Sequence, residues 1–260
     1  MLRKILSSIP NVRGRQRALL MLDFFMGSSR IAARHGVQLE GYYSSAQDLA
    51  FCRRESDNPL LEELIASLPK DGVFIDCGAN CGFYSSFAAR MLESDGFVIS
   101  FEPSAREYRR LQSAVKWNNH QCTWLTLHQA VGESSEVVSL LTAVGHTGMN
   151  RISNDKSTSE QTSSVWMTSV DSIVSEVIAK EKAINLVKID VEGYEMNVLR
   201  GLSNCLKEKR IDKMVVEVTD KFLKERGESK QSMIAYMKSF SYEPTIESDE
   251  WQYDEVFVKA

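Results

Sequence analysis

The sequence predicts an α/β fold built on a doubly wound, mostly parallel sheet of seven strands with an antiparallel hairpin at its C-terminal end. Short apolar runs such as "FVISFE" alternate with amphipathic helical segments, which is typical of parallel strands buried on both faces. A glycine-rich turn joins the strand that starts at Val73 to the helix after it. The last two apolar runs, "EPTIES" and "DEVFVKA", are joined too briefly for a helical crossover, so they should pair antiparallel.

The first elements of this sheet have clear local signals. "DNPLLEELIASLP" has a capping residue at Asp57 or Asn58 and Pro59 in its first turn, which predicts a helix leading into the strand at Val73. Residues 83–92 continue at helical spacing after the glycine turn. The run "FVISFE" is then the second strand.

Beyond the second strand, Ser104 and Glu107 have the spacing of a capping box, which predicts the start of a helix that runs to about Asn118. "CTWLTLHQAVG" is expected to be the third strand, and "EVVSLLTAV" and "SSVWMTSV" two more. The insert between these last two, residues 145–164, is rich in Ser, Thr, Asn and Asp, and so predicts a long loop.

The second half of the chain repeats the alternation. "AINLVKID" is a strand, and Tyr194, Val198 and Leu202 share one face of the helix after it. "DKMVVEV" is another strand, and helical spacing from Met233 to Phe240 leads into the final hairpin.

Composition describes an ordinary globular protein. The chain has 260 residues, of which 43% are hydrophobic and 25% charged, enough to bury one substantial core. The net charge of -4 gives no overall electrostatic reason to expect nucleic-acid binding. Cys77 and Cys81 are spaced like half of a zinc site, but no second Cys/His pair follows, so no metal is expected. Reduced thiols packed beside a ligand fit a cytoplasmic protein.

The N-terminal region is expected to form a helical lead-in, residues 1–58, before a main domain of residues 59–260. It is basic until Asp23, and this acid interrupts an apolar run over residues 18–26 that is too short to span a membrane. Two interpretations are open: a helix that packs on the main domain, or a basic amphipathic segment that contacts a membrane surface peripherally.

The chemistry-bearing motifs follow predicted strands, where open α/β sheets bind their ligands. "DCGANCG", from Asp76 to Gly82, follows the first strand, Glu102 ends the second, and "KIDVEGYE", from Lys188 to Glu195, ends a later one. An acid at the end of the second strand can accept hydrogen bonds from both ribose hydroxyls of a nucleotide.

Two nucleotide cofactors suit such a site. A nicotinamide dinucleotide requires G-x-G-x-x-G so that its pyrophosphate can approach the helix N-terminus. This chain has D-x-G-x-N-x-G instead, with Asn80 where the second glycine is needed. The side chains of Asp76 and Asn80 suit the ammonium and carboxylate of S-adenosylmethionine better than a diphosphate.

Several segments resemble the FkbM-type methyltransferases in order and spacing: "FIDCGANCGFYS", "SFEPS", "NNHQCTWLTLHQAVG", "TSVDSIV" and "LVKIDVEGYEMNVLRGL". The match covers roughly residues 61–217. It implies a class I methyltransferase (Rossmann-like) fold, S-adenosylmethionine as cofactor, and usually O-methylation of small molecules, sugars or glycans. The residues that look like cofactor contacts by this resemblance are Asp76, Gly78, Asn80, Gly82, Glu102 and Ala130. Family members usually have Asn or a similar residue where this chain has Gln129.

Methyl transfer to oxygen requires an aligned acceptor and a group that helps to remove the hydroxyl proton. Asp190 is the first candidate for the base or for orienting the acceptor, because it ends the strand beside the cofactor. Glu192 and Glu195 follow, and Lys188 is expected to hold one of these carboxylates. A structural charge network around this turn is the alternative, and His146 is a further candidate base.

The predicted acceptor is therefore a small molecule or a carbohydrate. Two other functions stay open at this point. One is an NAD(P)-dependent oxidoreductase on a similar sheet, which the missing G-x-G-x-x-G disfavours. The other is a non-catalytic domain that binds S-adenosylmethionine and a partner.

Overall fold

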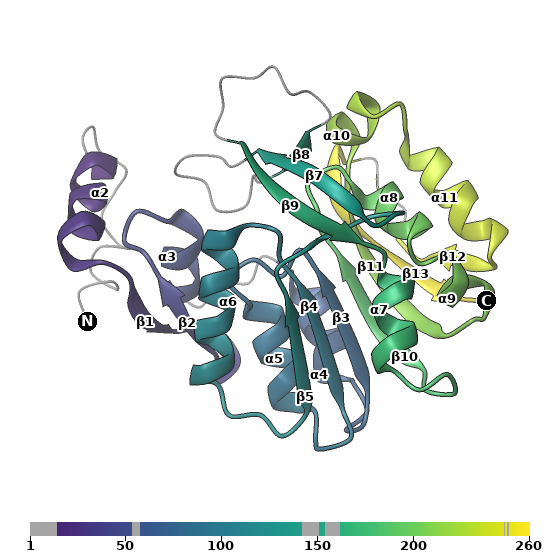
Figure 1. Cartoon of the computed structure of the whole chain (residues 1–260), viewed down its shortest axis with the longest axis horizontal. Helices are drawn as coiled ribbons and strands as arrows, with labels where there is room; N and C mark the ends of the chain where they lie inside the picture. The colour runs from purple at the N-terminus through teal and green to yellow at the C-terminus, as the bar shows by residue number, and fades with distance from the viewer. Residues whose placement is uncertain (1–14, 54–57, 142–150, 154–161, 247, 249) are drawn as a thin grey trace.

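The structure is a computed structural model that describes residues 15–53, 58–141, 151–153, 162–246, 248 and 250–260 (Figure 1). Among these residues, seven strands form one sheet in the order β12-β13-β11-β10-β3-β4-β5. This arrangement confirms the predicted α/β sheet. The strands are β3 (Val73–Cys77), β4 (Phe97–Phe101), β5 (Thr123–Leu127), β10 (Ile184–Ile189), β11 (Ile211–Thr219), β12 (Tyr242–Pro244) and β13 (Gln252–Lys259).

The pairing directions also agree with the prediction. β3, β4, β5, β10 and β11 are joined by parallel ladders. β13 runs antiparallel to both of its neighbours, β11 and β12. The predicted terminal hairpin is therefore confirmed, although its first strand is shorter than "EPTIES" and begins at Tyr242.

Helices cover both faces of this sheet, as Figure 1 shows. The side chain of Phe74 faces a cluster that includes residues of α4 and α5, whereas its neighbours Val73 and Ile75 face a cluster on the other side. This alternation follows from the period of two along a strand. One face carries α4 (Pro59–Ala66), α5 (Phe83–Met91) and α6 (Ala105–Trp117). The other carries α7 (Val170–Val177), α8 (Glu195–Arg200), α9 (Ser203–Lys207), α10 (Asp220–Glu225) and α11 (Lys230–Ser239).

A second sheet replaces part of the predicted loop and of the predicted third strand. Its order among the described residues is β6-β9-β7-β8, formed by β6 (Ala130–Val131), β7 (Glu136–Leu141), β8 (Arg151–Ser153) and β9 (Thr162–Thr168). Residues 151–153 are strand rather than loop because Ile152 is buried against Leu140 and Val165. The rest of the insert, residues 142–150 and 154–161 with His146, lies outside the described residues.

The segment before Pro59 contains a β-hairpin that the sequence analysis did not predict. The hairpin is formed by β1 (Ser29–Ala32) and β2 (Gln38–Gly41), joined by the 3-10 turn η1 (Arg34–Gly36). Helix α2 (Arg15–Met26) precedes it, and α3 (Ala46–Arg53) follows it. Within the described part of the chain, no helix has the length and apolar character needed to cross a membrane. Helix α4 begins as predicted, with the Asn58 side chain accepting a hydrogen bond from the Leu61 amide at 2.8 Å.

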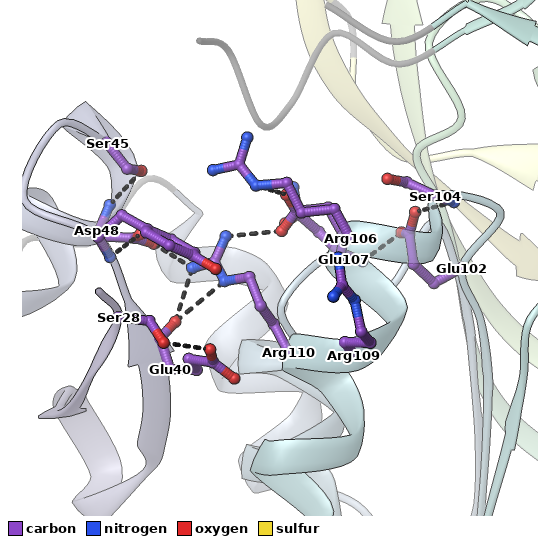
Figure 2. Close-up of polar contacts among 12 residues, drawn as sticks. Ser28, Glu40, Ser45, Asp48, Glu102, Ser104, Arg106, Glu107, Arg109 and Arg110 are labelled. Carbon is purple, nitrogen blue, oxygen red and sulfur yellow. Dashed lines mark hydrogen bonds and ion pairs between the residues drawn. The ribbon is translucent and has the colours of Figure 1, made fainter. Parts of the chain in front are cut away.

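A buried ion-pair network joins this N-terminal segment to α6 (Figure 2). The Arg110 guanidinium donates to Asp48 of α3, to the carbonyl oxygen of Glu40 at 2.8 Å and to Glu107 at 2.6 Å. The predicted capping box is therefore wrong, because Glu107 binds Arg110 instead of returning to Ser104. The Ser104 amide is satisfied by Glu102 at 2.8 Å.

We expect Arg110→Leu to lower the free energy of unfolding by about 3–5 kcal/mol, because it leaves the buried Asp48 carboxylate without its ion-pair partner and removes one of the two arginines paired with Glu107. Denaturant unfolding measures the loss. The matched control is Arg109→Leu, which changes an exposed arginine in the same helix and should shift stability by no more than about 0.5 kcal/mol. Equal losses in the two variants would contradict a structural role for the network.

Candidate active site

The turn between β3 and α5 depends on two glycines with left-handed backbones. Gly78 has φ +84°, and a Cβ at this position would lie 1.9 Å from the carbonyl oxygen of Asp190. Gly82 has φ +86°, and its Cβ would lie 2.6 Å from a methyl carbon of Leu111 in α6. Gly78 thus lets the ends of β3 and β10 meet, and Gly82 lets α5 pack on α6.

The amides of this turn are already hydrogen-bonded within the protein. Gly78 and Ala79 both donate to the carbonyl oxygen of Phe101, at 3.1 and 2.9 Å. The Asn80 amide donates to Glu102 at 2.7 Å, and that of Gly82 to the carbonyl oxygen of Ala79 at 2.8 Å. These four N–H groups do not form the free cradle that a pyrophosphate requires.

Glu102 lies at the end of β4 with each carboxylate oxygen on a backbone amide. One oxygen accepts from the Asn80 amide. The other accepts from the Ser104 amide, as Figure 2 shows. Glu102 is only 5% exposed, and this burial raises the pKa of its carboxyl group to about 8. Glu102 also lines a cavity at this edge of the sheet. Its remaining lone pairs can accept hydrogen bonds from hydroxyl groups bound there.

Asp76 lies beneath the turn rather than on the cavity wall. It is fully buried, and the Ser85 hydroxyl donates to its Oδ2 at 2.6 Å. Its Oδ1 lies 3.3 Å from the Lys188 ammonium. The geometry therefore gives Asp76 a supporting position behind the turn.

Lys188 joins the two sides of the site. Its Nζ donates to the carbonyl oxygen of Gly78 at 3.0 Å and lies 3.2 Å from Asp190 Oδ2. Burial lowers the pKa of Lys188, but the carboxylates of Asp190 and Asp76 outweigh this effect and raise it above its ordinary value. The ammonium is therefore charged and paired.

Three carboxylates meet on the cavity wall beyond this lysine. Asp190 has a side chain that is 39% exposed, and Glu192 follows it in the next turn. Glu217 of β11 also lines the cavity, and the sequence analysis missed it. Burial and then the charge of Asp190 raise the pKa values of Glu192 and Glu217 to about 8. The signal for Glu217 was an acid inside the apolar run "DKMVVEV".

Glu195 has a different position from the other predicted carboxylates. It is buried behind the turn, and its Oε1 accepts from the amides of Gly193 at 2.9 Å and Val191 at 3.2 Å. Burial raises the pKa of Glu195 to about 7. Because it does not line the cavity, its geometry fits the structural alternative for this motif.

A single cavity of about 600 Å³ brings these groups together. Its lining includes Gly78, Asn80, Glu102 and Ala130 of β6, together with the carboxylates of Asp190, Glu192 and Glu217. The N-terminal segment contributes Gln47 and Phe51 of α3 to the wall, which the sequence analysis did not predict. Aromatic side chains of Tyr84 and Tyr253 complete it.

Metal binding finds no support in the described residues, where no group of three or more His, Cys, Asp or Glu side chains is arranged to hold an ion. The cysteines of the chain are free and buried, as the sequence analysis expects. Burial raises the pKa of Cys81 to about 12, so this residue stays a protonated thiol and a poor ligand.

We expect Gly78→Ala to reduce stability by about 4 kcal/mol or more, because the new Cβ overlaps the Asp190 carbonyl oxygen. The matched control is Gly227→Ala. That glycine has a similar φ of +73° but nothing within 4 Å of its Cβ position, so only the backbone strain of about 1–2 kcal/mol is expected. Thermal and urea unfolding compare the stabilities of the two variants. Similar losses would show that the close contact between Gly78 and the Asp190 carbonyl oxygen does not require glycine at this position.

The chain is similar in sequence to known methyltransferases. The model of the methyltransferase FkbM domain matches residues 76–244. Methyltransferase 1 of Beauveria bassiana is 24% identical over 178 residues, covering 60% of this chain and 68% of that protein. The hexuronic acid methyltransferase AglP of Haloferax volcanii is 27% identical over 193 residues, covering 73% and 72%.

Among solved structures, M. jannaschii TYW2 in complex with AdoMet has a TM-score of 0.41 and 13% identity, covering 90% of this chain and 87% of that one. A score this low assigns neither fold nor function. The family match spans more than half of the chain, and it confirms both the methyltransferase prediction and S-adenosylmethionine as the cofactor. The chain belongs to the family of methyltransferases with an FkbM domain.

Proposed function

We propose that this protein transfers the methyl group of S-adenosylmethionine to a hydroxyl group of an uncharged sugar, glycan or small polyhydroxy molecule. One observation carries the proposal. The cavity that contains Glu102 is continuous with the wall that carries Asp190, Glu192 and Glu217. A nucleoside bound at one side therefore has carboxylates near the place where an acceptor must approach.

The residues on the first side fit this cofactor. Glu102 offers a carboxylate to the ribose hydroxyls, and Ala130 leaves room for the adenine ring beside β6. Next to Ala130, the side-chain oxygen of Gln129 is buried and has no hydrogen-bond partner within the described residues. An adenine amino group at this place would satisfy that oxygen.

The cofactor, when bound, supplies a methyl group that is already activated on a sulfonium. The chain's own residues must align the acceptor and remove its proton. Lys188 fixes the Asp190 carboxylate at 3.2 Å, and Asp190 orients the hydroxyl or takes its proton. Glu192 and Glu217, whose pKa values are raised to about 8, provide further sites for that proton near neutral pH.

The charge of the wall supports an uncharged acceptor. In the described part of the chain, Lys188 is the one lysine or arginine on the cavity, and it is already paired with Asp76 and Asp190. A carboxylate on the acceptor would face Asp190 and, once Glu192 and Glu217 are ionised, two further negative charges. Likeness to a hexuronic acid methyltransferase supports a carbohydrate, whereas this wall favours a neutral one.

Calorimetry should detect binding of S-adenosylmethionine or of its demethylated product, and no binding of NAD.

We expect Glu102→Ala to weaken cofactor binding by about 1–3 kcal/mol, because ribose hydroxyls and two amides lose their acceptor. Glu243→Ala, on the exposed part of β12, is the control and should bind normally. Tight binding of NAD, or an unchanged affinity in the Glu102 variant, would contradict the assignment.

Methyl transfer is tested with isotopically labelled S-adenosylmethionine and matched pairs of acceptors, each a neutral glycoside and the corresponding uronic acid. We expect product from neutral glycosides and little from the acids.

Asp190→Asn keeps the shape but removes the charge, so kcat should fall by roughly 10²-fold while cofactor affinity changes only a few-fold.

The pH profile separates the roles of the carboxylates. A base whose pKa is raised in the free enzyme makes kcat/KM increase as pH rises through about 8, and Glu217→Gln should remove that limb if Glu217 takes the proton. Normal turnover of Asp190→Asn would remove Asp190 from the mechanism. Cofactor binding without turnover on any acceptor would favour the non-catalytic alternative.

A further inference from the structure

Helix α2 presents an exposed apolar face at the edge of the molecule. Figure 1 shows it beside the N-terminal hairpin and away from the central sheet. Phe24 and Phe25 are 84% and 80% exposed, and Met21 is 65% exposed. Leu20 is exposed on the same helix. Such a group of large apolar side chains on a surface helix usually marks a contact with another phase or molecule.

The opposite face of α2 is attached to the protein, so the apolar face cannot turn inward without breaking this attachment. Leu19 packs in a buried cluster with Tyr43 and Leu49. The carboxylate of Asp23 accepts hydrogen bonds from the amides of Tyr43 at 2.5 Å and Ser44 at 2.8 Å. The acid that interrupts the apolar run in the sequence is therefore used for docking.

A basic residue lies along the outward face. One row on the helix surface contains Arg17, Leu20 and Phe24, at positions i, i+3 and i+7. An adjoining row contains Met21 and Phe25, at positions i and i+4. The two rows lie on the same side of the helix. Arg17 is exposed like its apolar neighbours.

The charge of the N-terminal sequence has the same sign throughout this region. No acidic residue precedes Asp23, whereas the whole chain has a net charge of -4. The basic residues before it are Arg3, Lys4, Arg13, Arg15 and Arg17. A basic region beside exposed aromatic side chains is complementary to an anionic surface that has an apolar interior.

We propose that α2 docks the protein on the surface of an anionic lipid bilayer, with Leu20, Met21, Phe24 and Phe25 in the interface and Arg17 among the headgroups. A second copy of the chain is a weaker occupant. Two α2 faces would bring two basic segments together, and one helix of 12 residues offers less area than a stable dimer needs. This proposal does not depend on the identity of the methyl acceptor.

The test is co-sedimentation of the full chain with vesicles of phosphatidylcholine alone or mixed with equal phosphatidylserine. We expect binding to the mixed vesicles that weakens as salt rises, and much weaker binding to phosphatidylcholine. The double variant Phe24→Ser with Phe25→Ser should bind about tenfold more weakly or worse. The matched control is Val137→Ser with Trp166→Ser, which removes exposed apolar side chains from the second sheet and should bind normally.

Cofactor affinity and melting temperature show whether the variants are folded, and both should be unchanged because the substituted side chains are exposed. Failure of the unchanged protein to bind either vesicle would overturn the proposal. So would equal loss of binding in the Phe24/Phe25 variant and its control. Self-association that disappears in the Phe24/Phe25 variant, without vesicle binding, would assign the face to a second copy.

Discussion

The site depends on the ion pairs that the buried ammonium of Lys188 makes with two carboxylates. The ammonium lies 3.3 Å from Asp76 and 3.2 Å from Asp190, and it donates to the Gly78 carbonyl oxygen. A buried charge without partners is very costly, so these groups must stay together for the protein to remain folded. Because they belong to β3, to its turn and to β10, the lysine fixes the carboxyl ends of both strands. The Gly78 backbone can approach Asp190 only without a Cβ.

A second buried cation has a similar role on the other side of the cavity. Arg110 is paired with Asp48 and Glu107, and through Asp48 it holds α3 against α6. Helix α3 then contributes Gln47 and Phe51 to the cavity wall. The N-terminal segment is therefore part of the candidate site, and its position depends on charges within the main domain.

Sequence patterns located the residues that end strands. Glu102 and Asp190 are the clearest cases, because an acid after an apolar run falls at the edge where ligands bind. Glu217 was missed because it lies within its strand, and only the pairing with β10 and β13 brings it to the cavity. Gln47 and Phe51 reach the wall through the Arg110 network, which no local pattern shows. The Ser104–Glu107 spacing was misleading since a tertiary partner, Arg110, competes for the same carboxylate.

The raised pKa values of Glu192 and Glu217 have a consequence for the proposed reaction. With pKa values of about 8, both groups are mostly protonated at neutral pH before the cofactor binds, even though the charge of Lys188 lowers the pKa of Glu192. An opposite charge within a few ångströms favours the ionised form, so a bound sulfonium would lower these pKa values. Glu192 and Glu217 would then be ionised in the cofactor complex and would act as bases toward the acceptor. Loss of the sulfonium charge after transfer would reverse the shift, which allows the wall to keep the proton taken from the acceptor.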